Sequence, residues 1–430
     1  MTTEPKYVSP AEAVSIIESG DHVYIQGSTS VPEVLVKALA DRGSELRDVT
    51  LYSAFAVTKG PAPYCKPEYK ESFLVDSFFV SNSVRKWIEE GYGTMTPRFL
   101  GEVPALFRDG TCRVDVALIN CSEPDENGYV SFGVSADLAT SAVECADRVI
   151  AQINPHMPYS YGDAVIHISQ LAAMVHVDEP LVEVPTAVPT EKEIRIGNFI
   201  AEHIPDGATL QIGVGGIPNA VIRALEGHKH LGLHTEAMTD GVLPLLEKGI
   251  IDNSQKKIMP GKSVASLALG SKRLYDYMNY NKDIVVKDVA WTNNPFIIAQ
   301  NPKVMSINSC LEIDLTGQVC ADSIGTRIFS SDGVQFLTLF TDDLYFRIGE
   351  HADRLAGILK DGFKSKGYRM YIDSPTNQQF FVLPNEVIDR LSESVGFELW
   401  GPRGEEESVV RFVTDWSTTD EDVAELISLI

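Results

Sequence analysis

A glycine-rich loop and a glutamate that follows it could carry chemistry together. The loop, residues 213–218, reads Gly-Val-Gly-Gly-Ile-Pro, and Glu236 ends the stretch Leu-Gly-Leu-His-Thr-Glu. Glycines let backbone N–H groups approach a ligand closely, and a helix that starts there adds partial positive charge. A carboxylate that faces such donors can attack an acyl thioester, because the donors stabilise the oxyanion that forms. The pair therefore indicates nucleophilic acyl transfer.

Each feature taken alone is more often structural, since such loops are common turns and most glutamates are solvated. The loop is not a P-loop, because no Gly-Lys-Ser/Thr follows, and Pro218 replaces the third glycine of a dinucleotide fingerprint. His228, His230 and His234 have no nearby cysteine to complete a familiar metal-ligand set, so we expect no metal. The G-x-S-x-G motif of serine hydrolases is absent.

The elements that position these residues form a unit that occurs twice. Residues 19–39 match residues 205–225 without a gap. Each copy has the pattern of an amphipathic helix, a polar turn, a β-rich strand that ends in glycine, and a loop. A proline, Pro32 or Pro218, is then expected at the first position of the next helix, where its missing N–H has no cost. The pattern predicts a duplicated strand–loop–helix unit of a mostly parallel sheet.

The copies differ after that helix, where the second carries Glu236 and the first runs Val-Thr-Leu-Tyr-Ser-Ala over residues 49–54. One active site per chain is expected, at the carboxyl edge of the second sheet beside the loop. We predict an α/β fold of two similar domains with mostly parallel sheets, plus a small C-terminal α/β segment. The predicted boundaries are residues 1–185, 186–335 and 336–430.

Charge and cysteine content limit the possible binding partners and the expected compartment of the protein. The 430 residues include 36 basic and 60 acidic side chains, a net charge of −24, which argues against nucleic acid and anionic membrane as partners. The six cysteines form no C-x-x-C pair, which favours reduced thiols. The N-terminus lacks the apolar region of a secretory signal, and no apolar run is long enough to span a bilayer. A soluble cytoplasmic protein is expected.

Distinctive blocks run through residues 5–335. They are Glu102-Val-Pro104, Pro124 to Ser135, Ala151 to Pro158, Gly213 to Pro218, His234-Thr-Glu236, Pro260 to Ser266 and Leu315 to Gly325. In this order the blocks resemble the acetyl-CoA hydrolase/transferase family, and most closely the 4-hydroxybutyrate and butyrate CoA-transferases.

The resemblance implies a ping-pong CoA-transferase. Glu236 would attack the donor acyl-CoA, and CoA thiolate would convert the resulting anhydride into a glutamyl-CoA thioester, from which a carboxylic acid such as acetate, butyrate or 4-hydroxybutyrate accepts CoA. Asn293 would be the side-chain oxyanion donor, although Asn294 could fill that role. Coenzyme A is the implied co-substrate, and a homo-oligomer is implied. The residues implied to contact CoA or the oxyanion are Gly213, Val214, Gly215, Gly216, Ile217 and Pro218.

The resemblance weakens near residue 333. The family's next segment has three glycines that help to form the active site, and the matching stretch here, residues 329–337, keeps Gly333 alone. Residues 336–430 resemble the small C-terminal domain of threonine aldolases and related β-eliminating lyases. Pyridoxal phosphate is not expected, because the domain that carries its Schiff-base lysine is missing. A fusion of two segments is our hypothesis for this junction.

Within the C-terminal segment the pattern predicts a helix over residues 350–366, strands near Tyr368 and Val409, and a final helix after a capping box of Thr418 and Glu421. Two alternatives to a transferase remain at this stage. One is an acyl-CoA hydrolase of the same family, in which water reaches the glutamyl intermediate. The other is an inactive CoA-binding or structural chimera.

Overall fold

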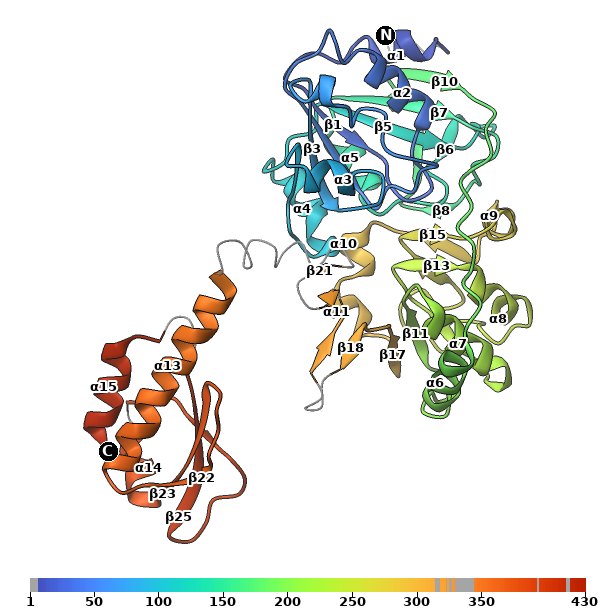
Figure 1. The fold of residues 1–430 in the computed structure, drawn as a ribbon. Helices are drawn as coiled ribbons and strands as arrows, with labels where there is room; N and C mark the ends of the chain where they lie inside the picture. Colours follow the sequence, from blue (N-terminus) through green and yellow to red (C-terminus); the bar gives the residue numbers. More distant parts are fainter. Residues whose placement is uncertain are drawn as a thin grey trace. The chain divides into compact units, whose positions relative to one another are not determined.

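The computed structural model divides the chain into two units, Met1–Gly333 and Val334–Ile430 (Figure 1). The residues that it describes are 7–313, 318–321, 323–324, 327–328, 344–392, 394–414 and 418–430.

The first half of the larger unit is built on a parallel sheet of seven strands (Figure 1). In sheet order, the strands are β10 (Ala173–His176), β7 (Arg148–Ile153), β5 (Val116–Cys121), β1 (His22–Ile25), β2 (Val49–Ala54), β3 (Phe73–Phe79) and β4 (Gly93–Met95). Each neighbouring pair is parallel. The carboxyl ends of these strands therefore share one edge, at which the loops after β1 and β2 meet.

Helices cover both faces of this sheet, as the strand sequences require. Every residue of β5 is buried, which is typical of a parallel strand between two helical layers. Val116 and Leu118 share a core with α1 (Pro10–Val14) and α2 (Glu33–Asp41). Ala117 and Ile119 point to the other face, toward α4 (Val103–Arg108) and α5 (Ala139–Cys145).

The second half of the larger unit consists of smaller parallel sheets. The first has the order β12 (Gly232–Leu233), β11 (Thr209–Ile212), β17 (Val304–Ile307); the others are β13 (Ala237–Thr239) with β15 (Leu267–Leu269), and β14 (Ser263–Ala265), β16 (Ile284–Val286) and β8 (Tyr161–Gly162). Strand β8 comes from the first half of the chain. One hydrophobic core also contains residues of both halves, so the halves fold as one body.

The helices of this half are α6 (Glu191–Ala201), α7 (Gly216–Ala224), α8 (Leu243–Glu247), α9 (Lys272–Met278), α10 (Val289–Thr292) and α11 (Pro295–Ile298). Short antiparallel pairs complete the unit: β6 (Tyr129–Ser131) with β9 (Val165–His167), β18 (Glu312–Ile313) with β19 (Val319–Cys320), and β20 (Ser323–Ile324) with β21 (Arg327–Ile328). Nowhere in the described ranges is a helix long and apolar enough to cross a membrane.

The duplicated strand–loop–helix unit is confirmed, in β1 followed by α2 and in β11 followed by α7. The prediction that a proline occupies the first helical position was wrong in both copies. Pro32 is the residue before α2, and Pro218 is the third residue of α7. In the second copy Gly215 adopts a φ of +144°, a backbone conformation that favours glycine, and α7 begins directly after it. Pro218 still lies in the first turn, where its missing N–H has no intrahelical acceptor.

The smaller unit packs helices on an antiparallel sheet of its own. The sheet order is β22 (Arg369–Ile372), β23 (Gln378–Pro384), β25 (Glu407–Val413), β24 (Glu398–Leu399), and the helices are α13 (Leu344–Ser365), α14 (Asn385–Leu391) and α15 (Asp420–Leu429). Phe363, Phe381 and Phe412 form the centre of its core. The strands predicted near Tyr368 and Val409 are confirmed.

Two boundaries in this unit were wrong. Helix α13 begins at Leu344, before the predicted residue 350, because its amphipathic pattern extends toward the N-terminus. The capping box before α15 is formed by Thr419 and Asp422 and not by Thr418 and Glu421. Asp422 accepts the Thr419 backbone N–H at 2.8 Å, and Thr419 accepts the Asp422 N–H at 3.1 Å, so the shorter acid completes the reciprocal pair.

Candidate active site

Glu236 lies between β12 and β13, directly beside the start of the glycine loop. The hydroxyl of Thr235 accepts the backbone N–H of Ile212 at 3.1 Å and donates to the Ile212 carbonyl at 2.9 Å. Ile212 is the last residue of β11, where the loop of residues 213–218 begins. The carbonyl of Glu236 accepts the backbone N–H of Ser266 at 2.9 Å. These bonds hold the half-buried Glu236 at the carboxyl edge of the sheet.

Asn293 faces Glu236, whereas the adjacent Asn294 caps a helix. The Asn293 side-chain amide donates to Glu236 Oε2 at 2.5 Å. The Asn294 side chain accepts the backbone N–H of Phe296 at 2.9 Å and thereby caps α11. The structure thus brings Asn293, of the two adjacent asparagines, to the carboxylate.

The position of Asn293 is set by the short helix that precedes it. Asp288 begins α10 by accepting the Ala290 N–H at 2.7 Å, and its other oxygen pairs with Arg108 at 2.5 Å. Gly101 packs against Asn293 so closely that an added Cβ would lie 3.2 Å from the Asn293 Cβ. The last turn of α10 is therefore held from both sides, and the amide has little room to move away from Glu236.

His234 links the two segments that carry Glu236 and Asn293. Its Nε2 donates to the Thr292 carbonyl at 2.8 Å, so the residue two before Glu236 binds the residue before Asn293. The ring is buried and stacks on Trp291, with 5.6 Å between ring centroids. Burial lowers the pKa of His234; the hydrogen bond to the Thr292 carbonyl opposes this, and the nearby Lys256 charge lowers the pKa further. His234 is therefore neutral at pH 7 and acts as a structural link.

Sequence reasoning missed a buried acid next to this pair, Asp137. The Ser135 hydroxyl donates to Asp137 Oδ1 at 2.8 Å, and the side chain is 2% exposed. Burial raises the pKa of Asp137 to about 6; the charges of Glu236 and Asp288 add to the rise, while hydrogen bonds from Ser135 and the Leu138 N–H oppose it. The negative charge of Glu236 thus acts on a second carboxyl in a dry environment.

The backbone explains how Asp137 reaches the site from the first half of the chain. The Ala136 N–H donates to the Ser266 carbonyl at 3.0 Å, and the Ser266 N–H donates to the Glu236 carbonyl. The carbonyl of Asp137 accepts the Val289 N–H at the start of α10 at 3.1 Å. No sequence signal pairs residues so far apart, and Asp137 stands just outside the distinctive block that ends at Ser135.

The glycine loop is open to a ligand. The side chain of Val214 is 52% exposed, and Gly215 takes the φ of +144° that lets α7 start. A Cβ at Gly216 would overlap the carboxylate of Glu193, which lies against the start of this helix. An acid at that point disfavours a phosphate there, so the loop suits a neutral part of a ligand better than an anionic one. Ile217 and Pro218, which were also predicted to bind, form the first turn of α7.

The remaining predicted positions are Gly333 and the histidines His228 and His230. Gly333 lies outside the described residues. His228 and His230 have separate partners, the Ile204 carbonyl at 2.9 Å and Asp252 at 2.7 Å. In the described part of the chain, no group of three or more His, Cys, Asp or Glu side chains could hold a metal ion.

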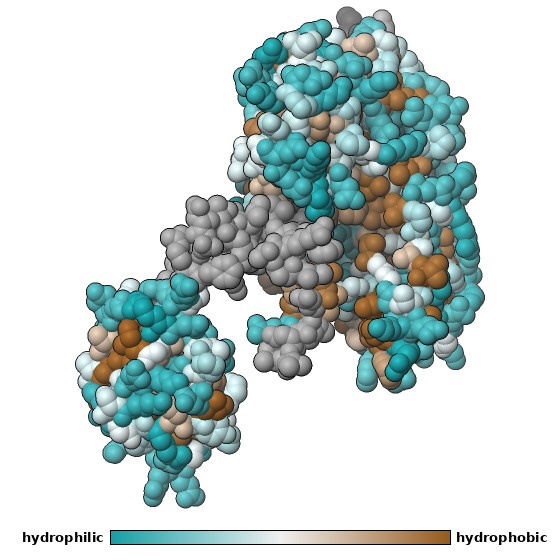
Figure 2. Space-filling view, in the orientation of Figure 1, coloured by the Kyte–Doolittle hydropathy of each residue, from teal (hydrophilic) through white to brown (hydrophobic). Residues whose placement is uncertain are grey.

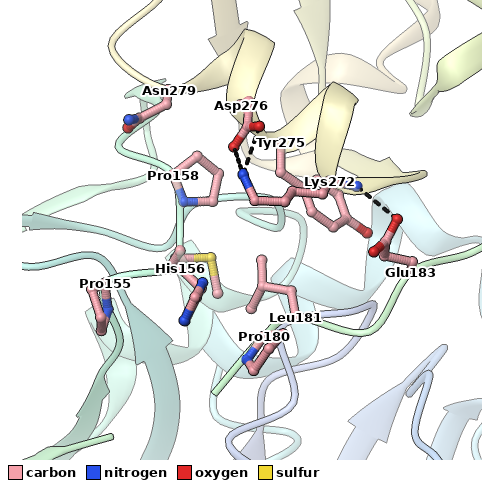
Figure 3. A pocket seen from close by; sticks show the side chains of 11 residues that line it. Pro155, His156, Pro158, Pro180, Leu181, Glu183, Lys272, Tyr275, Asp276 and Asn279 are labelled. Carbon is pink, nitrogen blue, oxygen red and sulfur yellow. Dashed lines mark hydrogen bonds and ion pairs between the residues drawn. The ribbon is translucent and has the colours of Figure 1, made fainter. Parts of the chain in front are cut away.

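A cavity of about 190 Å³ lies against α9 but contains none of these residues (Figure 3). Lys272 and Tyr275 of α9 line one side, and Pro180 and Leu181 line the other. The Lys272 ammonium is already paired with Asp276 at 2.6 Å, as the dashed lines in Figure 3 show. Neither Glu236 nor Asn293 lines this cavity, and its Lys272 is already paired.

The larger unit matches known sequences over most of its length. Residues 3–186 match the acetyl-CoA hydrolase/transferase N-terminal domain, and residues 270–338 match its C-terminal domain. A succinyl-CoA:acetate/propanoyl-CoA:succinate CoA transferase of Fasciola hepatica is 42% identical over 335 residues, 77% of this chain and 69% of the relative. A 4-hydroxybutyrate coenzyme A transferase of Clostridium kluyveri is 40% identical over 77% of this chain and 76% of the relative.

Solved structures agree with these matches. A 4-hydroxybutyrate CoA-transferase of Porphyromonas gingivalis is 40% identical with a TM-score of 0.65, over 73% of this chain and 75% of that one. RipA of Yersinia pestis is 34% identical with a TM-score of 0.69, over 74% of this chain and 76% of that one. The resemblance of residues 336–430 to threonine aldolases finds no support among the matched proteins. The chain belongs to the acetyl-CoA hydrolase/transferase family.

Proposed function

We propose that this chain transfers coenzyme A between an acyl-CoA and a free carboxylic acid, with Glu236 as the nucleophile. The observation that carries the proposal is the 2.5 Å contact between the Asn293 amide and Glu236 Oε2 at the carboxyl edge of a parallel sheet. Relatives that are 32–42% identical carry names of CoA-transferases that act on succinyl-CoA, 4-hydroxybutyrate or butyryl-CoA. Acetate, butyrate, 4-hydroxybutyrate and succinate are therefore the acids to test first.

The chemistry runs through two acyl transfers on one carboxylate. A Glu236 oxygen attacks the thioester carbonyl, the C–S bond breaks, and an acyl-glutamyl anhydride and CoA thiolate form. The thiolate then attacks the glutamyl carbonyl, which releases the donor acid as carboxylate and leaves CoA bound to Glu236 as a thioester. An acceptor carboxylate reverses the sequence. Asn293 donates to the oxyanion in each tetrahedral intermediate, and Gly213 to Gly216 contact the pantetheine part of CoA.

Acceptor-dependent kinetics test this proposal. We expect formation of the new acyl-CoA to depend on both acyl-CoA and acid, with the parallel double-reciprocal lines of a ping-pong reaction. Glu236→Gln should lower kcat by at least about 10⁴-fold, because the amide cannot form the anhydride. Glu193→Gln, a half-buried acid beside the loop, is the matched control and should keep kcat within about threefold. Thioester loss at the same rate without acid would identify a hydrolase instead, and a fully active Glu236→Gln would refute the proposal.

A further inference from the structure

Lys256 is a buried lysine without a carboxylate partner. Hydrophilic residues cover much of the surface of the larger unit in Figure 2, and a lysine normally lies at such a surface. Lys256 is only 4% exposed, and no carboxylate of the described residues lies within 4.0 Å of its ammonium. Burial of an unpaired cation is costly and lowers the pKa of Lys256 to about 7. A group of this kind is a candidate for a functional role.

The Lys256 ammonium joins the ends of two strands. Its Nζ donates to the Leu233 carbonyl at 2.8 Å and to the Lys262 carbonyl at 2.6 Å. Leu233 is the last residue of β12, and Lys262 directly precedes β14. These two strands belong to different sheets of the second half. One side chain therefore ties two sheets together at this point.

Asn253 bridges the same two strands from the same loop. Its Oδ1 accepts the Leu233 N–H at 2.8 Å, and its Nδ2 donates to the Ser263 hydroxyl at 3.0 Å. Both polar groups of the Leu233 backbone are thus bound by side chains, the N–H by Asn253 and the carbonyl by Lys256. We call Asn253 and Lys256 the clasp, because they hold β12 against β14 with side chains.

Glu236 follows the clasp directly in the chain. Two residues after Leu233, the Thr235 N–H donates to the Val264 carbonyl at 3.0 Å, so the two segments now bind each other through their backbones. Glu236 is the next residue, and its carbonyl accepts the Ser266 N–H at 2.9 Å. The clasp therefore sets the spacing of the two segments just before the residue that carries the carboxylate.

Lys256 also acts on the segment that carries Asn293. Its charge lowers the pKa of the buried His234, which directly follows the strand that Lys256 binds. His234 in turn donates to the Thr292 carbonyl at 2.8 Å, and Asn293 is the next residue. Both residues of the proposed active site, Glu236 and Asn293, are therefore linked to the strand end that Lys256 holds.

The stem of Lys256 is fixed by close packing on β12. A Cβ added at Gly232 would lie 2.6 Å from Lys256 Cγ and 2.9 Å from Cδ, closer than side-chain atoms can approach. The aliphatic stem thus crosses the strand where glycine leaves it room, and the ammonium has little freedom to leave the two carbonyls. A hydrogen bond from a charged donor is stronger than one from a neutral donor, which adds to the stiffness of this tie.

We propose that Lys256 is a positioning residue for CoA transfer: it fixes the end of β12 against β14 and thereby holds the Glu236 carboxylate beside the Asn293 amide. This inference rests on the function proposed above. Lys256 acts through the backbone and does not touch the substrate. Its loss should therefore slow the attack by Glu236 and leave the binding of acyl-CoA almost unchanged.

The test compares Lys256→Met with Lys262→Met. Lys256→Met keeps an unbranched apolar stem but removes the donors, and we expect kcat to fall about 10- to 100-fold, because a nucleophile displaced by about 1 Å can lose that much rate. KM for acyl-CoA should stay within about threefold. Lys262→Met is the matched control: it removes an exposed charge that pairs with Asp283 at 3.1 Å and keeps the backbone carbonyl that Lys256 binds. Its kcat should stay within about twofold of the wild type.

A second variant displaces Lys256 without removing its charge. The added methyl of Gly232→Ala would push the Lys256 stem off β12. We expect kcat to fall about 3- to 10-fold, again with KM within about threefold, because the ammonium is still present but is misplaced. Urea unfolding of every variant shows which of them are folded under the conditions of the assay.

The readouts separate this inference from the function on which it rests. Formation of the glutamyl-CoA adduct from acyl-CoA is followed by mass in the wild type and in each variant. If the wild type forms the adduct and folded Lys256→Met keeps its kcat, changes KM alone, or loses no more rate than Lys262→Met, Lys256 does not position Glu236. If Lys256→Met does not fold, an unchanged kcat in Gly232→Ala overturns the inference. If the wild type forms no adduct, the proposed function itself fails, and the inference with it.

Discussion

The two copies of the strand–loop–helix unit have opposite surroundings in the same chain. The loop of the first copy, residues 27–32, aligns position by position with residues 213–218. Ser28 and Ser30 of the first loop are completely buried, whereas Val214 of the second is 52% exposed. The first loop is closed to ligands because its own serine side chains and the surrounding residues fill the space around it. The second has Val214, Gly215 and Gly216 at the positions of Ser28, Thr29 and Ser30, and it remains open to a ligand.

The difference extends to the strand that follows each helix. In the first copy the carboxyl end of β2 leads to Phe55, which packs against the other half. In the second copy the equivalent region carries Glu236. Tyr275 from the second half donates its hydroxyl to Thr29 at 3.1 Å and so fastens the first loop. We therefore assign a structural role to the first copy and the proposed active site to the second, and each substitution below tests that assignment.

After Glu236 itself, the largest effect is expected at Asn293, on the side of the second copy. Asn293→Ala should lower kcat by about 10²- to 10³-fold, because an oxyanion donor is lost. Asn294→Ala is the matched control: it removes the cap of α11 and about 1 kcal/mol of stability but should leave kcat within about threefold. Steady-state rates and urea unfolding measure the two effects. Equal losses of kcat in the two variants would contradict the assignment of the oxyanion donor to Asn293 and of the helix cap to Asn294.

A glycine pair gives the next largest effect and tests the two loops directly. A Cβ at Gly27 would overlap the backbone carbonyl oxygen of Ala54, which cannot move without disturbing β2. Gly27→Ala should therefore cost about 3 kcal/mol in the free energy of unfolding. A Cβ at Gly213 meets the Asn308 side chain at 2.5 Å, which can rotate away. Gly213→Ala should cost about 1 kcal/mol or less and raise KM for acyl-CoA.

Urea unfolding of both variants, with KM for each, checks this pair. Similar stabilities would mean that the first loop is as adaptable as the second, and the division between scaffold and site would then have no energetic basis.

The smallest effect concerns Asp137, an acid that the first half places near Glu236. Its pKa is about 6 in the folded protein against 3.8 ordinarily, so the folded state holds the proton more tightly than the unfolded state. The contribution of the Asp137 carboxyl to the free energy of unfolding is fully present below pH 4. It falls as the pH rises to about 6 and is absent above that. Between pH 4 and pH 7, the free energy of unfolding of Asp137→Asn should fall by about 2–3 kcal/mol less than that of the wild type. Parallel pH curves of unfolding free energy for the two proteins would contradict the burial of this charge beside Glu236.

The sequence was sufficient where local pattern decides the outcome. Matching glycines and prolines revealed the repeat, and its strand–loop–helix pattern predicted a mostly parallel sheet. Glu236 stood out because it follows a strand one unit after a glycine loop. These features depend on residues close together in the chain, and the physical rules that they follow are local.

The rest depended on contacts between distant segments. The sequence could not tell which of Asn293 and Asn294 faces Glu236. In the structure Asn294 caps α11, and Asn293 donates to Glu236. The link from His234 to Thr292 and the approach of Asp137 each join segments that are far apart. The helix start at Gly216 depended on one backbone angle at Gly215, which the residue type permits but does not require.

The most direct test of the central role of Glu236 is to map the covalent intermediate. The protein is mixed with acyl-CoA in the absence of an acceptor acid, digested and analysed by mass spectrometry. We predict a CoA adduct on the peptide that contains Glu236, which disappears when acetate is added and is absent from Glu236→Gln. An adduct on another residue, or turnover of acyl-CoA to a new thioester with Glu236→Gln, would contradict the account.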